Sequence, residues 1–270
     1  AAAPGASNTF EAGDKVIKQK GYFAGADFFT MFSYPLLKGN AAATLSEPGA
    51  IAISRKMAEA FFDSPENAYG KTILFDNKES LKITAVFDDV PANASRQFDF
   101  LRTWNDFVQQ NQWVNNWGNT DPVSFVQLRA GADPTATAAK IKDFIYRYRQ
   151  KAEGTTVELG LQSYADVYLN SVFKNGYPDG GRMEYVHLFT IVAIFVLLIA
   201  CINFMNLATA QAAKRAKEVG LRKVVGAQRS SLIKQFMGEA VMLTLIAILI
   251  ALACAAVLMP AFNALSGKQL

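Results

Sequence analysis

The sequence predicts an α+β extracytoplasmic domain followed by transmembrane α-helices. Three observations predict this fold class: mixed strand and helix patterns at the start, two long uncharged runs near the end, and a basic segment between those runs. We expect a first domain at residues 1–184 and a second at 185–270, with spans at about 186–208 and 240–260 and a cytoplasmic helical link at 209–239. A chain of 270 residues that is 51% hydrophobic has room for both parts.

Short strands and helices alternate across the first domain. Period-2 alternation predicts strands, and an apolar face that follows a capping residue predicts helices. The expected strands lie near residues 15–17 and at 50–53, 73–75, 81–87, 123–129 and 157–161. The expected helical segments are a turn capped by Asp27, a helix capped by Ser54, residues 98–108, and a helix that begins at Asp133 and Pro134. We expect loops at 76–80 and 111–121 and a linker at 175–182.

The two uncharged runs extend from Tyr185 to Ala213 and from Ala240 to Gly267, and neither contains Asp, Glu, Lys or Arg. A helix of about 20 residues crosses ~30 Å of hydrocarbon. A buried core helix is the alternative for any apolar run, but uncharged stretches well beyond about 18 residues are typical of membrane spans. Their length and position exclude a signal peptide.

The segment between the runs accounts for most of the net positive charge of the chain. Basic residues in short loops favour the cytoplasmic side, which places residues 209–239 there and residues 1–184 on the other face. The alternative is a loop that only marks topology and touches lipid headgroups. Because the net charge of +4 comes mostly from this segment, it does not indicate nucleic-acid binding. The basic residues are Lys214, Arg215, Lys217, Arg222, Lys223, Arg229 and Lys234.

The order of residues in the link predicts more than a topology signal. Glu218 lies four residues before Arg222 and four after Lys214, a spacing that allows pairing along one helical face. Gly220 and Gly226 are expected to interrupt the helix. The pattern therefore predicts a short helix, bracketed by glycines and presented to a protein partner. It carries apolar residues at helical spacing, which are Val219, Leu221, Val224 and Val225.

Other candidate sites are weaker. A phosphate-binding loop that ends in Gly70-Lys71-Thr72 would need glycine where Pro65 stands, so we expect a tight turn there. His187 is the only histidine, and the sequence shows neither a metal-ligand cluster nor a catalytic constellation. Trp104, Trp113 and Trp117 are interpreted as core residues, with a ligand surface as the alternative.

Two asparagines lie inside the first expected span. Asn203 and Asn206 are three residues apart, which places them on one helical face. Polar side chains in hydrocarbon favour partners on other helices, with about 0.6–2 kcal/mol for each contact. We expect a helix–helix contact at this face. The alternative is a position near the cytoplasmic interface that tolerates polar residues.

The stretch from Asn203 to Ala240 closely resembles the FtsX-like permease domain of MacB-type ABC transporters. In that family the second and third spans flank a cytoplasmic segment of the form R-x-x-E-[IV]-G-[IVL]-[RL]-[KR]-x-[VL]-G-A. The resemblance implies a coupling helix that docks on a separate ATP-hydrolysing subunit or domain, which would bind the ATP and Mg²⁺. The residues implied in coupling are Arg215, Lys217, Glu218, Val219, Gly220, Leu221, Arg222, Lys223, Val225, Gly226 and Ala227.

The first domain resembles the MacB-like periplasmic core domain. The stretches DFFTMFSYPLLKGN, AIAISRKMAEAFF and VFDDVPANASRQFDF are similar to recurrent segments of that domain and occur in the family's order. Family members usually have four spans and act as dimers in the inner membrane, so the spans here would be the second and third of a longer protein. The resemblance implies a machine that moves an extracytoplasmic domain for export, extraction or signalling.

A second hypothesis comes from a different class of protein. A membrane-anchored sensor or binding module without energy coupling would explain the first domain and the spans equally well. It would leave the ordered motif between the spans as a coincidence. The observation that separates the two hypotheses is whether the link binds an ATPase.

Overall fold

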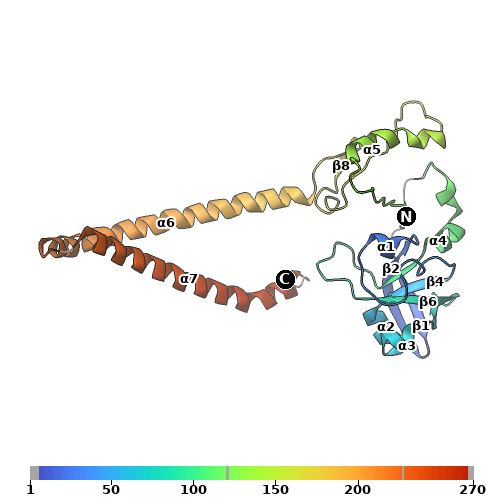
Figure 1. Ribbon diagram of the computed structural model, residues 1–270, viewed down its shortest axis with the longest axis horizontal. Helices are drawn as coiled ribbons and strands as arrows, with labels where there is room; N and C mark the ends of the chain where they lie inside the picture. The colour runs from blue at the N-terminus through green and yellow to red at the C-terminus, as the bar shows by residue number, and fades with distance from the viewer. Residues whose placement is uncertain (1–5, 120–121, 227, 267–270) are drawn as a thin grey trace. The chain divides into compact units, whose positions relative to one another are not determined.

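The computed structural model describes residues 6–119, 122–226 and 228–266 (Figure 1). The chain forms two compact units, Ala1–Gln162 and Ser163–Leu270. The first unit is a mixed α and β fold, and the second is dominated by two long helices. The predicted fold class, an α+β domain followed by apolar helices, is confirmed.

One mixed sheet organises the first unit. Its strand order is β3-β6-β4-β7-β2-β1-β5, and β5 also pairs with β6, so that only β3 stands outside a closed ring of strands. The pairs β2–β7 and β4–β6 are parallel, and the other pairs are antiparallel. Ring closure satisfies strand edges that would otherwise be open. The strands are β1 Ala6–Ala12, β2 Lys15–Ala24, β3 Leu36–Lys38, β4 Ala50–Ser54, β5 Thr72–Phe75, β6 Glu79–Phe87 and β7 Phe100–Thr103.

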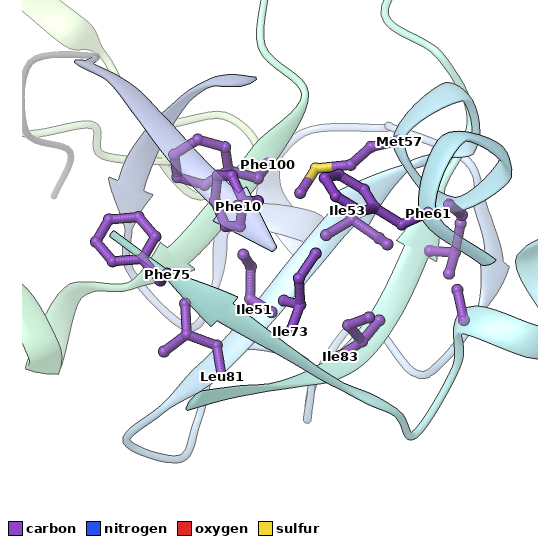
Figure 2. Packing of buried hydrophobic residues seen from close by; sticks show 13 residues of the cluster. Phe10, Ile51, Ile53, Met57, Phe61, Ile73, Phe75, Leu81, Ile83 and Phe100 are labelled. Carbon is purple, nitrogen blue, oxygen red and sulfur yellow. The ribbon is translucent and has the colours of Figure 1, made fainter. Parts of the chain in front are cut away.

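Alternation along the strands separates two buried clusters. On β4, Ile51 and Ile53 belong to one cluster, whereas Ala52 belongs to the other. Figure 2 shows the first cluster, in which the ring of Phe10 lies 5.2 Å from that of Phe75 and 4.8 Å from that of Phe100. Edge-to-face aromatic pairs of this kind add about 0.5–1.5 kcal/mol beyond area burial.

Local signals placed several elements correctly. Ser54 caps helix α2 (Arg55–Phe62), because its hydroxyl accepts from the Met57 amide at 3.2 Å. Strands β5 and β6 form a hairpin whose turn contains Asp76 at φ 48° and Asn77 at φ 56°. Helix α1 (Phe28–Met31) begins after Asp27, although the Asp27 side chain makes no capping hydrogen bond. Helix α3 spans Pro65–Ala68.

The predicted helix at residues 98–108 is wrong in its first half. Residues Phe100–Thr103 form β7, and helix α4 begins only at Trp104 and ends at Gln110. All four β7 residues are buried, including Arg102, because β7 pairs with β2 on one side and with β4 on the other. This tertiary pairing outweighs local helix propensity.

The predicted strands at 123–129 and 157–161 are also wrong. The first has only an isolated bridge at Val123, and the second has no strand. The backbone of the second finds other partners, because the Val157 amide donates to the Tyr146 hydroxyl at 2.7 Å and the Leu159 amide donates to the Lys142 carbonyl at 3.0 Å. Lys142 directly follows helix α5 (Pro134–Ile141), and Tyr146 lies within the 3₁₀ turn η2 (Phe144–Arg147). Another 3₁₀ turn, η1, spans Gln112–Asn115. Helix α5 begins at Asp133 and Pro134 as predicted, and the Asp133 carboxylate accepts from the Thr135 amide at 2.9 Å.

The second unit is built on helices α6 and α7. A small hairpin of β8 (Phe173–Lys174) and β9 (Tyr177–Pro178) precedes them. Helix α6 spans Arg182–Val224, and α7 spans Arg229–Ser266. Both are long and apolar enough to cross a membrane. The two uncharged runs are therefore helical over the described residues.

Candidate coupling hairpin

Helices α6 and α7 meet at a tight turn (Figure 1). The turn depends on Gly226, whose φ of 97° lies in the left-handed region that favours glycine. The Val225 amide donates to the Leu221 carbonyl at 3.1 Å, and the Gly226 amide donates to the Lys223 carbonyl at 3.2 Å. These bonds satisfy carbonyls that the end of a helix leaves free. Ala227, which the motif places in the coupling segment, lies outside the described residues.

The expected break at Gly220 is wrong. Helix α6 continues through Gly220 without interruption, so the motif forms the end of a long helix rather than a separate short one. Glycine inside a helix costs about 1 kcal/mol relative to alanine but does not forbid the helix. A Cβ built on Gly220 meets no atom within 4 Å among the described residues. No contact within the described hairpin therefore requires glycine there.

One face of α6 meets α7 across a shallow groove of about 270 Å³. At about 100° per residue, positions three and four apart share a face, which accounts for the lining residues. Apolar side chains form most of the lining, and an arginine and a glutamate face each other across it. The lining residues are Phe204, Leu207, Ala208, Gln211, Ala212, Arg215 and Val219 from α6, with Phe236, Glu239, Ala240 and Leu243 from α7.

An ion pair bridges this groove. The Arg215 guanidinium donates through both terminal nitrogens to the two Glu239 carboxylate oxygens, at 2.6 and 2.9 Å. This two-bond geometry is the strong form of an arginine–carboxylate contact. Both residues lie outside the expected spans. The hydrogen bond from Arg215 lowers the pKa of the Glu239 carboxyl, and the same bond raises the pKa of Arg215.

A second polar contact joins the helices nearer the turn. Arg222 donates through Nη2 to Glu218 at 2.6 Å and through Nη1 to Gln235 of α7 at 2.9 Å. The predicted pairing of Glu218 with Arg222 is therefore confirmed, and Arg222 rather than Lys214 takes the Glu218 carboxylate. Sequence reasoning missed Gln235 and Glu239 as partners. A lone carboxylate at the start of an uncharged run was the available signal for Glu239.

The other side of α6 carries a different set of residues. Lys214, Lys217, Leu221 and Val224 follow each other at three- and four-residue spacing, which places them on one face, and we call this set the outward stripe. Leu221 is 72% exposed, Val224 is 88% exposed, and Val225 just beyond the helix is 82% exposed.

The lysines of the hairpin remain without counter-charges. The two carboxylates of the segment are taken by Arg215 and Arg222. Among the described side chains, none forms an ion pair with Lys214, Lys217, Lys223 or Lys234. The outward stripe therefore combines exposed apolar side chains with lysines that have no ion-pair partner among the described side chains.

The remaining candidates lie apart from this arrangement. Asn203 and Asn206 are exposed on α6 and do not line the groove, so a contact with another helix stays a prediction. Over the described residues, no group of three or more metal-ligating side chains is found. Gly70 adopts φ 80° in a turn that leads into β5, which confirms the tight turn.

The interpretation of the tryptophans as core residues is wrong for two of them. Trp113 and Trp117 are exposed, and Trp117 stacks on Tyr148 with ring centroids 4.2 Å apart. Trp104 is partly buried and stacks on Phe107 within α4. Their positions in and after α4, rather than in the sheet, account for this exposure.

A folded α and β unit followed by an apolar helical hairpin defines a membrane protein that carries a folded domain ahead of its spans. Comparison with known families identifies the particular class. Residues 1–144 match the MacB-like periplasmic core domain, and residues 190–269 match the FtsX-like permease C-terminal domain. The chain belongs to the MacB-type family of ABC transporter permeases.

Several curated relatives share one name. The chain is 25% identical over 194 residues to the macrolide export ATP-binding/permease protein MacB of Burkholderia lata, which covers 72% of this chain and 26% of that protein. It is 23% identical over 213 residues to the protein of that name from Neisseria meningitidis, which covers 79% of this chain and 31% of the relative. The chain thus spans less than a third of the length of these relatives.

The chain also has partial similarity to solved structures. A domain of a putative permease protein from Porphyromonas gingivalis is 23% identical, with a TM-score of 0.47, and the match covers 56% of this chain and 70% of that one. The periplasmic region of MacB from Actinobacillus actinomycetemcomitans is 15% identical, with a TM-score of 0.39, and the match covers 53% and 63% of the two chains.

Proposed function

We propose that this chain is the permease part of an ABC transporter of the MacB/FtsX type. In this proposal a partner ATPase binds ATP and Mg²⁺ and hydrolyses the ATP, and the α6–α7 hairpin transmits the resulting motion to the extracytoplasmic unit. The work is mechanical, so substrate need not pass between the helices. Export, extraction and transmembrane signalling are all compatible with this mechanism.

The observation that carries the proposal is the outward stripe at the tip of the hairpin. Leu221 and Val224 are largely exposed, and they lie beyond the uncharged run that ends at Ala213. When a partner fully buries an apolar side chain that lies outside the hydrocarbon, the burial contributes about 1.5–3 kcal/mol to the free energy of binding. Lys214 and Lys217 belong to the same stripe, so it would complement a partner surface on which acidic residues surround an apolar groove.

Helix α6 provides the means of transmission. It is continuous over 43 residues, which corresponds to roughly 65 Å at 1.5 Å per residue. Its first turn is bonded to the segment ahead of it, since the Met183 amide donates to the Leu169 carbonyl at 3.1 Å. A displacement of the tip is therefore carried by one helix to the residues that lead into the span.

The orientation follows from charge. The four unpaired lysines and the two paired arginines favour a cytoplasmic position for the tip, and the first unit then lies on the periplasmic side of the inner membrane. Family members are usually dimers, and we expect Asn203 and Asn206 to contact another helix, either in a second copy or in another permease. Membrane lipid surrounds the remaining apolar surface of the spans.

Co-purification tests this function: the full-length protein that contains this chain, which we call the full-length parent, is isolated and probed for the ABC ATPase that is encoded beside it. The double variant Leu221→Asp, Val224→Asp places two carboxylates in the outward stripe and should abolish recovery of the ATPase. The matched control is Val16→Asp, which adds an acid at a valine that is 60% exposed on β2 of the first unit. If the unaltered protein recovers no ATPase, the hypothesis of a sensor without energy coupling replaces this one.

A further inference from the structure

The residues of the coupling motif do not all face the same way. Arg215 and Val219 line the groove toward α7, and Arg222 bonds to Gln235 of α7. Lys217 and Leu221 lie on the outward stripe. A motif that served only to dock a partner would place its charged residues on the free surface. Here both arginines are engaged within the hairpin.

We propose that Arg215 with Glu239, and Arg222 with Gln235, form an interhelical clamp that positions the docking tip. This inference rests on the proposed function, and it assigns the two arginines to positioning rather than to contact with the ATPase. The lysines and apolar residues of the outward stripe make that contact instead. Glu239 and Gln235, which lie outside the motif, then have a positioning role as the partners of these arginines.

The geometry of the two contacts supports a clamp. The pair Arg215–Glu239 uses two hydrogen bonds of 2.6 and 2.9 Å between residues 24 positions apart in the sequence. Arg222 adds a bond of 2.9 Å between residues 13 positions apart. The contacts sit at two levels of the hairpin, so together they restrain both the separation and the rotation of the helices.

The clamp requires arginine rather than any cation. A guanidinium presents a planar fork that satisfies both oxygens of a carboxylate, whereas a lysine ammonium is a point charge on a flexible stem. A single exposed ion pair contributes little to stability. The role assigned to the clamp is therefore the geometry of the hairpin, and membrane insertion does not depend on it.

The clamp also sets the charge that the partner meets. Glu218 and Glu239 are the acidic residues of the segment, and each is occupied by an arginine. Neither carboxylate therefore pairs with a lysine of the segment.

Distance measurement between spin labels tests the clamp without the ATPase. Labels are attached at Ala216→Cys and Ser231→Cys, which are exposed positions off the outward stripe, in a Cys201→Ala, Cys254→Ala background of the full-length parent in lipid nanodiscs. The unaltered hairpin should give one narrow distance distribution. Arg215→Ala should lose the narrow peak, and the charge swap Arg215→Glu with Glu239→Arg should restore it.

The matched control is Lys214→Ala, which removes an adjacent cation that has no described ion-pair partner and should leave the narrow peak in place. Arg215→Lys should recover only part of it, because it keeps the charge and loses the two-bond geometry. A narrow peak in Arg215→Ala overturns the clamp.

The same variants are then compared in ATPase co-purification and in ATP-driven distance changes. Arg215→Ala should still recover the ATPase while it loses the ATP-driven change between the labels. If Arg215→Ala abolishes recovery and keeps the narrow peak, Arg215 is a docking residue and the clamp is refuted, although the proposed function stands. If the unaltered protein recovers no ATPase, the proposed function fails, and the label distances alone decide the clamp.

Discussion

Asp106 in α4 pairs with Arg102, the one arginine that is buried among the described residues of the first unit. Arg102 on β7 is 1% exposed, and its Nη2 donates to Asp106 at 2.9 Å and to Glu79 at 2.7 Å. The Asp106 carboxylate also accepts from the Gly49 amide at 3.0 Å. We predict that Asp106→Ala destabilises this unit strongly, because it leaves a buried cation and a backbone amide without their partner.

The magnitude follows from these contacts. Breaking a buried ion pair costs about 3–5 kcal/mol, much of it from the charge left behind. Glu79 is 42% exposed, so the pair that remains is screened by solvent and offsets little of the loss. The aromatic rings of Phe75 and Phe23, at 4.4 and 5.2 Å from the guanidinium carbon, remain in place in the variant. We expect the free energy of unfolding to fall by about 3–5 kcal/mol.

Tryptophan fluorescence during urea denaturation of the intact chain in detergent micelles measures this change. All three tryptophans, at 104, 113 and 117, lie in the first unit, so the signal reports that unit alone. Asp106→Asn keeps an acceptor for the Gly49 amide and should lose less. The double change Arg102→Met, Asp106→Leu should lose less than Asp106→Ala, because apolar replacement of a buried pair is often neutral and only the Gly49 amide is left without its acceptor. A loss below about 1 kcal/mol in Asp106→Ala would refute this reasoning.

Three further predictions concern the hairpin. Because Arg215 lowers the pKa of the Glu239 carboxyl, the clamp is fully present above the ordinary glutamate pKa and is lost as the pH falls through the lowered pKa of Glu239. The narrow spin-label distance peak should therefore broaden on acidification, and Glu239→Gln should remove that pH response. Gly220→Ala should raise helix stability by up to about 1 kcal/mol. Gly226→Ala should instead cost about 1–3 kcal/mol because of the positive φ at that position. Thermal scans of helicity measure both changes, and a Gly226→Ala variant more stable than Gly220→Ala would contradict both predictions. A cysteine placed in the first unit should react with an impermeant thiol reagent on spheroplasts while one at Gln228 stays protected, and the opposite labelling would overturn the topology.

Signals that are local in sequence predicted their elements well. The Ser54 cap, the β5–β6 hairpin and the Glu218–Arg222 pair each depend on residues within a few positions of one another. The two uncharged runs predicted α6 and α7 for the same reason, since length and composition are sufficient to indicate a spanning helix.

Features that depend on tertiary contact could not be predicted in this way. The segment that contains Arg102 has a helical pattern in isolation, but its strand pairs with β2 and β4 and encloses the guanidinium. The pairing of Arg215 with Glu239 joins two helices, and the sequence does not specify which faces of those helices meet. The structure places Arg215 and Val219 of the motif at the groove, whereas Lys217 and Leu221 lie on the outward stripe.

A photo-reactive amino acid placed at single positions of α6 tests the central claim most directly. In the proposed mechanism the outward stripe contacts the ATPase, and the groove face contacts α7. A probe at Leu221 in the full-length parent should cross-link to the ATPase, and a probe at Val219, two residues away on the groove face, should cross-link within the chain. Cross-linking to the ATPase from Val219 but not from Leu221 would contradict the account.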